Sequence, residues 1–191
     1  MSSGRWMAAI LTSVALAGCE DSVAPEGLTP TRYSFDVTVT DDSLTRSLIG
    51  ITEILTMPNG HSEPWPRPSG QMVGTDRTVF SLIPGPSVSG LSIVLLGPFG
   101  TGDFELHHDG ERIDPTARKF EAFYSIEAPA GEWRHYAIDS GTVRVGWAGE
   151  RRALTFSLFA DTARLVRMGA HAGVESRPIE LAGRVISTQK N

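Results

Sequence analysis

Apolar and polar residues alternate with a period of two along much of the chain, and this spacing is typical of half-buried β-strands. The clearest example covers residues 32–40, where Tyr33, Phe35, Val37 and Val39 alternate with polar side chains. Similar short runs, rich in β-branched or aromatic residues, cover residues 44–57, 78–83, 91–96, 102–107, 119–126, 141–147, 153–160 and 179–187. The pattern therefore predicts about eight to ten strands.

Turn-forming residues separate these runs, so neighbouring strands are expected to pair as antiparallel hairpins. Asp41 and the two residues after it end the first run, and residues 148–151 (Ala-Gly-Glu-Arg) form a tight turn between two later ones. Residues 160–169 could hold one helical turn, and a helix is possible for the second half of residues 44–57, although the Thr and Ile content of that run favours a strand. We therefore expect an all-β fold, namely an antiparallel β-sandwich, with a β-barrel as the alternative.

Length and composition are those of one folded domain with short appendages. The chain has 191 residues, of which 40% are hydrophobic and 20% are charged. Its formal net charge of −5 argues against nucleic-acid binding, because phosphate contacts require a basic surface. There is a single cysteine, Cys19, which excludes an intramolecular disulfide, so the hydrophobic core must stabilise the fold without one.

The N-terminal residues differ from the rest and predict an export signal. Residues 6–17 form an apolar run of about a dozen residues, which is too short to span a bilayer but suits the core of a signal peptide. The run ends in four residues that resemble the lipobox of bacterial lipoproteins, in which Leu and a small residue precede Gly or Ala and then Cys. In this chain they are Leu16, Ala17, Gly18 and Cys19.

The resemblance to bacterial lipoproteins implies that the Cys19 sulfur receives a diacylglycerol and that the chain is cut before this residue. Residues 1–18 would then be the signal peptide, residues 19–30 the lipidated cysteine and a flexible tether, and residues 31–191 a single all-β domain. Two acyl chains such as palmitate anchor a protein stably, since each buried methylene contributes about 0.8 kcal/mol. We therefore expect a lipid-anchored protein of the cell envelope, on the periplasmic or extracellular side of a bacterial membrane.

A second resemblance covers most of the C-terminal half and concerns strand and turn residues. This part is similar to a β-rich domain that is common in secreted bacterial lipoproteins. The matching features are a Gly-x-Gly before a short strand (Gly100 and Gly102), a Ser-Gly-Thr-Val strand start (residues 140–143) and a Phe-Ser-Phe-x-Ala-like strand (residues 156–160), with Leu158 in place of the second Phe. No activity is established for that domain, so the resemblance implies a fold and no site residues.

Acidic and histidine side chains on one predicted strand form the first candidate site. Asp103, Glu105 and His107, followed by Asp109, would share one face of an extended segment. Carboxylates and imidazole can bind a divalent metal ion. The solvent-facing side of an edge strand also has this alternation, so the sequence leaves both interpretations open.

Trp65 gives a second candidate, a binding site for a glycan or a protein. It lies between prolines within residues 58–71, a stretch dense in Pro, Gly, Asn and Ser that predicts a long surface loop. An exposed tryptophan can stack on a sugar face or anchor a protein partner. Alternatively, the side chain folds back and closes the end of the sandwich.

A hydrolase is the third class of function to consider. His135, Asp139 and Ser140 are close in sequence, but a catalytic triad depends on three-dimensional geometry, and Asp-Ser-Gly is ordinary turn chemistry before a strand. We expect no catalytic residue and no cofactor. The leading hypothesis is a non-enzymatic, membrane-anchored β-sandwich that binds or scaffolds an envelope protein or a glycan and no nucleic acid. A carbohydrate- or metal-binding module is the alternative.

Overall fold

Nearly all of the chain that the structure describes is extended. The structure is a computed structural model, and it describes residues 32–41, 44–57, 76–85, 89–108, 111, 114, 116–128, 131–167 and 170–190. The predicted signal peptide, Cys19, the tether and the loop that holds Trp65 lie outside the described residues. Every element of the described part is a β-strand, so the all-β class is confirmed.

Ten strands make up the described part of the chain. The first five are β1 (Arg32–Asp41), β2 (Thr45–Met57), β3 (Arg77–Leu82), β4 (Gly90–Leu96) and β5 (Gly102–Leu106). The second five are β6 (Lys119–Ala128), β7 (Glu132–Ala137), β8 (Ser140–Ala148), β9 (Arg151–Arg167) and β10 (Ala170–Ser187). The alternating runs of the sequence thus fall on strands, including the second half of residues 44–57.

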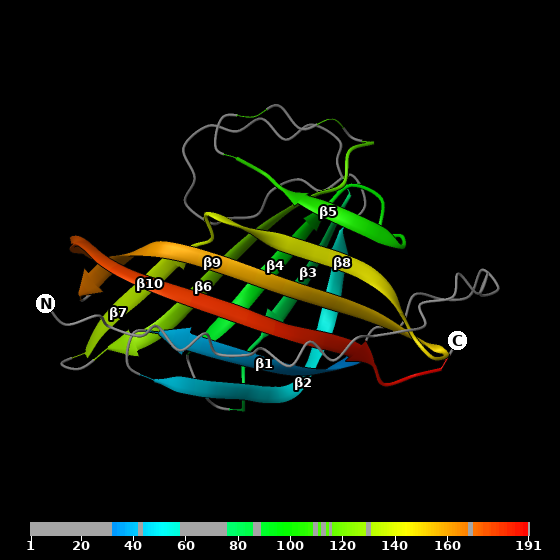
Figure 1. The fold of residues 1–191 in the computed structure, drawn as a ribbon, viewed down its shortest axis with the longest axis horizontal. Coiled ribbons are helices and arrows are strands. Elements are labelled where there is room, and N and C mark those ends of the chain that lie inside the picture. The colour runs from blue at the N-terminus through cyan, green and yellow to red at the C-terminus, as the bar shows by residue number, and fades with distance from the viewer. Residues whose placement is uncertain are drawn as a thin grey trace, which may run out of the picture.

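All ten strands belong to one sheet, in the order β10-β1-β2-β3-β4-β6-β5-β8-β9-β7. Two additional pairings, of β10 with β9 and of β6 with β7, close the hydrogen-bonded ladder into a circuit. The pairings are antiparallel except for that of β5 with β6, which is parallel. In Figure 1, β8, β9 and β10 cross in front of β3, β4 and β6. The two layers predicted for a sandwich are therefore parts of one sheet that folds over on itself.

The hydrophobic core lies on the inner face of this folded sheet. Alternate residues of a strand point into this core, as β1 shows: its buried and exposed residues alternate along the whole strand. The buried positions are those that the sequence pattern predicted, and their side chains pack with the inner rows of the other strands. The largest fully buried side chains are Tyr33, Tyr124, Phe35, Phe80, Phe120, Leu82, Leu91, Ile93, Leu95, Leu96, Leu154 and Leu158.

Two long strands correct the expectations for the C-terminal part. β9 remains extended to Arg167, so the helical turn suggested for residues 160–169 is wrong. β10 begins at Ala170, well before the predicted start at residue 179, and β7 was not predicted. β9 and β10 pair along nearly their whole length, from Ala170 opposite Arg167 onward. These cross-strand hydrogen bonds outweigh the weak local helix preference of the Ala- and Leu-containing segment.

Candidate functional site

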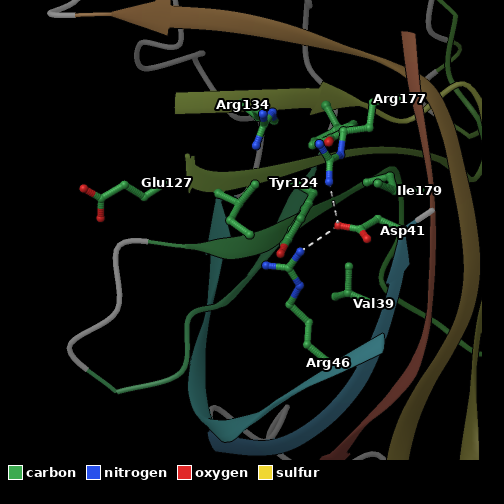
Figure 2. Close-up of a pocket in the computed structure, with 10 residues that line it drawn as sticks. Val39, Asp41, Arg46, Tyr124, Glu127, Arg134, Arg177 and Ile179 are labelled. Atoms are coloured by element: carbon green, nitrogen blue, oxygen red, sulfur yellow. Dashed lines mark hydrogen bonds and ion pairs between the residues drawn. The ribbon is translucent and has the colours of Figure 1, made fainter. Parts of the chain in front are cut away.

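A pocket of about 180 Å³ opens where the inner face of the sheet reaches one end of the molecule. Figure 2 shows the side chains that surround it, and they come from β1, β2, β6, β7 and β10. The described residues that line the pocket are Val39, Asp41, Arg46, Tyr124, Ile126, Glu127, Arg134, Tyr136, Arg177 and Ile179. Charged and phenolic groups therefore replace the aliphatic side chains of the core at this end.

Strand register brings these groups together. Val39 of β1 lies opposite Arg46 of β2, and Asp41 lies opposite Ile179 of β10. The backbone N–H of Leu44 donates to Asp41 Oδ1 over 3.0 Å, which fixes the carboxylate at the turn between β1 and β2. The inner row of β1 thus continues from core residues into the pocket.

A bulge in β10 places a second arginine. The register of β10 against β9 shifts between Ser176 and Ile179, and Arg177 lies within the shifted segment next to Pro178. Bulges bend a strand and re-aim the side chains within them, and proline is accepted there because no ladder hydrogen bond is required. Arg177 reaches Asp41 of β1 as a result.

Three arginines and two carboxylates form a network along one wall. Arg46 Nη2 lies 2.8 Å from Asp41 Oδ2, and Arg177 Nη2 lies 3.5 Å from the same oxygen, as the dashed lines in Figure 2 mark. Arg134 Nε lies 2.9 Å from Glu175 Oε2, and Arg177 Nη1 lies 3.9 Å from Glu175 Oε1. The side chain of Asp41 is only 5% exposed, so water screens its ion pairs poorly.

The network carries more positive than negative charge. Three guanidinium groups face two carboxylates, which leaves one positive charge in excess. Glu127 also lines the pocket, but it is exposed and its side chain points away from the arginines in Figure 2. The pocket interior is therefore more favourable for an anion than for a cation.

Two buried tyrosines, Tyr124 and Tyr136, also line the pocket, and the centres of their rings lie 5.9 Å apart. The Tyr124 hydroxyl and Arg46 Nε are buried and, among the described residues, have no hydrogen-bond partner. Burial raises the pKa of Tyr124, although the positive charge of Arg46 offsets part of that effect. Burial likewise raises the pKa of Tyr136. Both phenols are consequently neutral at ordinary pH and keep their O–H donors.

The predicted metal ligands on β5 are engaged with cations instead. Asp103 and Glu105 are exposed, as expected for one face of a strand. Asp103 Oδ1 lies 3.7 Å from Nε of Arg144, and Glu105 Oε2 lies 3.0 Å from Nζ of Lys119. An exposed pair such as that of Asp103 with Arg144 contributes little to stability.

His107 turns away from those two carboxylates. Its side chain is 7% exposed, its Nδ1 lies 2.9 Å from Glu121 Oε1, and its Nε2 lies 3.0 Å from the carbonyl oxygen of Glu111. Asp109 is outside the described residues. Among the residues that are described, no three His, Cys, Asp or Glu side chains come together as a metal site would require. The alternation along β5 therefore does not bring Asp103, Glu105 and His107 to one point.

The structure also separates the residues of the conceivable triad. His135 Nδ1 lies 2.8 Å from the Ser125 hydroxyl, on the neighbouring strand. Asp139 Oδ2 accepts from the backbone N–H of Asp161 over 2.7 Å. Ser140 begins β8 opposite Phe159. The side chains of His135 and Asp139 thus have different partners, and Ser140 lies in a third place in the sheet.

Sequence reasoning missed the pocket, although the chain contains a signal for it. Asp41 and Arg46 are in phase with the inner rows of β1 and β2, where core residues are expected. A charged residue in phase with a buried row must pair or bind something, because burying an isolated charge is costly. The sequence pattern predicts only the end of a strand at Asp41, and Arg134 lies on β7, a strand that the pattern does not predict.

Comparison with known proteins adds no relative. No protein-family model, curated protein or solved structure matches the chain. In the part of the chain that the structure describes, no helix is long and apolar enough to cross a membrane. Any function must therefore be argued from the chemistry of the pocket and from the sequence itself.

Proposed function

We propose that the chain is an exported lipoprotein, anchored to a membrane through Cys19, whose all-β domain binds a small organic anion in the pocket between Asp41, Tyr124 and Arg177. The anchor rests on the lipobox-like residues 16–19. The proposed class of ligand is inferred from the excess of positive charge in the network and from the hydrogen-bond donors of the pocket that have no partner among the described residues. The domain acts by binding and not by catalysis.

The Tyr124 hydroxyl is the observation that carries the binding proposal. A buried hydroxyl without a partner costs about 1–3 kcal/mol, and Tyr124 is 1% exposed. Arg46 Nε adds a second buried donor without a partner among the described residues. Both atoms belong to residues that line one pocket, and a ligand oxygen that accepts from them would recover this cost. A carboxylate suits both, since it accepts several hydrogen bonds.

Pocket size narrows the class of ligand. About 180 Å³ is smaller than the roughly 300–1,000 Å³ that drug-sized ligands occupy. The lining also contains Val39, Ile126 and Ile179, which can contact a short carbon skeleton. A small mono- or dicarboxylic acid matches this size and mixture of surfaces.

The lining favours binding over catalysis. Nucleophilic catalysis by Ser, Cys, Thr or Lys needs that side chain to be activated, usually by a base in reach. The described residues around the pocket include none of these four and no histidine. Their arginines and tyrosines orient and hold an anion, which is the role that the proposal gives them.

Titration calorimetry with succinate tests the ligand, with the neutral diamide of succinate as the comparison compound. We expect heat of binding with succinate only. Tyr124→Phe should weaken binding about 10- to 100-fold, because a hydrogen bond to a charged group contributes about 1.5–3 kcal/mol. Tyr33→Phe is the matched control, since it removes a buried, unpartnered hydroxyl far from the pocket and should leave the affinity unchanged. Equal binding of the diamide, or an unchanged affinity in Tyr124→Phe, would refute the proposal.

Mass spectrometry of the mature N-terminal peptide tests the anchor separately. We expect a peptide that begins at residue 19 and carries the mass of a diacylglyceryl group. Cys19→Ser should leave the protein unprocessed or release it from the membrane fraction. A mature protein that begins elsewhere and carries no lipid would overturn the anchor without affecting the pocket.

A further inference from the structure

A second depression lies on the outer face of the sheet, over β8, β9 and β10. It encloses about 400 Å³, more than twice the volume of the pocket. The described residues that line it are Arg144, Gly146, Trp147, Ala148, Ala153, Thr155, Arg184 and Ile186. We call this depression the outer groove.

Cross-strand register arranges the outer groove in two rows. In the first row, Thr155 of β9 lies between Arg144 of β8 and Arg184 of β10. Neighbouring strands are about 4.8 Å apart, so the two arginine Cα atoms are about 10 Å apart on one face of the sheet. Two side chains of that length can converge on a single anion above the Thr155 hydroxyl, which adds a third donor.

The second row is apolar and consists mainly of small residues. Ala153 of β9 lies between Gly146 of β8 and Ile186 of β10. Glycine and alanine leave free space above the backbone, while Ile186 supplies apolar contact at the side. A donor-rich row and an apolar row therefore lie side by side within one groove.

The two arginines have only weak competitors for an anion. Arg144 Nε lies 3.7 Å from Asp103 Oδ1, and these side chains are 65% and 77% exposed. Arg184 is exposed and lies opposite Asp36 of β1. Exposed pairs of this kind are worth about 0–1 kcal/mol, so a ligand that bridges both guanidinium groups can displace them.

We propose that the outer groove binds a single-chain fatty acid, with its carboxylate between Arg144 and Arg184 and its chain along Gly146 and Ala153. The volume is at the low end of the roughly 300–1,000 Å³ of ligand sites, which suits one acyl chain and not a lipid with two. The proposal does not depend on lipid at Cys19 or on an anion in the pocket.

Photocrosslinking of the full chain in lipid nanodiscs tests the outer groove. The probe is a dodecanoic acid that carries a diazirine in its chain, and peptides that carry the label are identified by mass spectrometry. We expect label on peptides from residues 140–160 and 180–190. Decanoate should compete with the probe, whereas acetate should not, because each buried methylene improves affinity about fourfold.

Variants and a neutral probe separate specific binding from adsorption to an apolar surface. Arg144→Gln combined with Arg184→Gln should reduce the labelling of these peptides at least tenfold. Arg164→Gln, which changes an exposed arginine of β9 outside the outer groove, should leave the labelling unchanged. The corresponding dodecanol probe should label at least tenfold less than the acid. Equal labelling by the alcohol, or full labelling of the double variant, would overturn the proposal.

Discussion

Each end of the folded sheet holds a buried tyrosine near an arginine, but the two arginines have different surroundings. At the pocket end, Arg46 beside Tyr124 pairs with the Asp41 carboxylate. At the other end, where β1 begins, Arg152 influences Tyr33 electrostatically, and its Nε and Nη1 have no hydrogen-bond partner among the described residues.

Aromatic rings take the place of carboxylates around Arg152. Its guanidinium carbon lies 5.1 Å from the centre of the Phe99 ring and 5.0 Å from that of Trp147. Phe80 packs between Tyr33 and Phe99, at centroid distances of 5.5 Å and 6.1 Å. We call these side chains, with Arg152, the aromatic end. Cation–π contacts need no acceptor oxygen, so the arginine can be covered by rings.

The contrast shows two ways to close a sheet that folds over on itself. Rings fill volume, and the aromatic end is closed by packing. Ion pairs need defined oxygen and nitrogen positions and leave space between them, so the pocket end keeps a cavity of about 180 Å³. Stability should therefore be concentrated at the aromatic end, and ligand binding at the pocket end.

Phe80→Ala should have the largest effect on stability. Phe80 is fully buried and joins two rings of the aromatic end, and large-to-small changes at such positions cost about 3–5 kcal/mol. Urea denaturation followed by circular dichroism measures the loss. A cost below about 1 kcal/mol would mean that packing at this end does not stabilise the body.

Asp41→Asn should have the next largest effect. It leaves Arg46 and Arg177 without the carboxylate that they share, and removing one partner of a buried ion pair costs about 3–5 kcal/mol. Because the two arginines are 35% and 27% exposed, we expect about 2–3 kcal/mol here. The same urea titration measures it, and 1 M salt should reduce the difference between variant and parent. A salt-independent difference would contradict the electrostatic explanation.

Alkaline pH should destabilise the protein through the aromatic end. Burial raises the pKa of Tyr33 from 10.0 to about 12, against the smaller opposing effect of Arg152. Between these values the unfolded chain loses the phenol proton and the folded chain keeps it, so stability falls as pH rises. The shift corresponds to about 2–3 kcal/mol over that range.

Denaturation at pH 9, 10, 11 and 12 tests this titration in the parent and in Tyr33→Phe. The variant should lose part of the pH dependence and should be at least as stable as the parent at pH 7, because it removes a buried, unpartnered hydroxyl. Tyr124 and Tyr136 titrate in the same direction and contribute to what remains. An identical pH profile in the variant would exclude Tyr33 as a source.

Acid should produce the smallest effect, on β7 next to the pocket. Burial, together with the positive charge of Arg164, lowers the pKa of His135. The neutral ring is therefore favoured in the folded state, and its contribution is present above the ordinary pKa of about 6.5 and is lost as pH falls below it. Hydrogen exchange of amides in β6 and β7 should accelerate between pH 7 and 5, after correction for intrinsic rates, while β3 amides stay protected. In His135→Gln, the exchange of β6 and β7 amides should no longer accelerate between pH 7 and 5.

The sequence predicts the positions of strands that have one buried face and one solvent-exposed face. The alternation from Tyr33 to Val39 predicted both β1 and its buried row. The sequence pattern does not predict β7, because Tyr136 is the only residue of this strand that is fully buried. It also does not predict the start of β10, because the polar residues there are extended only through their pairing with β9. Local pattern cannot report a pairing between distant segments.

The candidate site was harder to predict than the strands. Its groups come from five strands, and their convergence depends on register and on a bulge at Arg177. The alternation on β5 predicted the exposure of Asp103 and Glu105 correctly but not the inward turn of His107 toward Glu121. The roles suggested for Cys19 and Trp65 stay predictions, because both residues lie outside the described part of the chain.

The closed circuit of strand pairings has a consequence for the order of assembly. β1 needs β10 as a neighbour, and Tyr33 pairs with Ser187 near the other end of the chain. Contacts between such distant residues form slowly, so the ladder stays open until β10 has been synthesised. A ribosome-bound chain would expose the free edges of β1 and β9, where other chains could pair and aggregate.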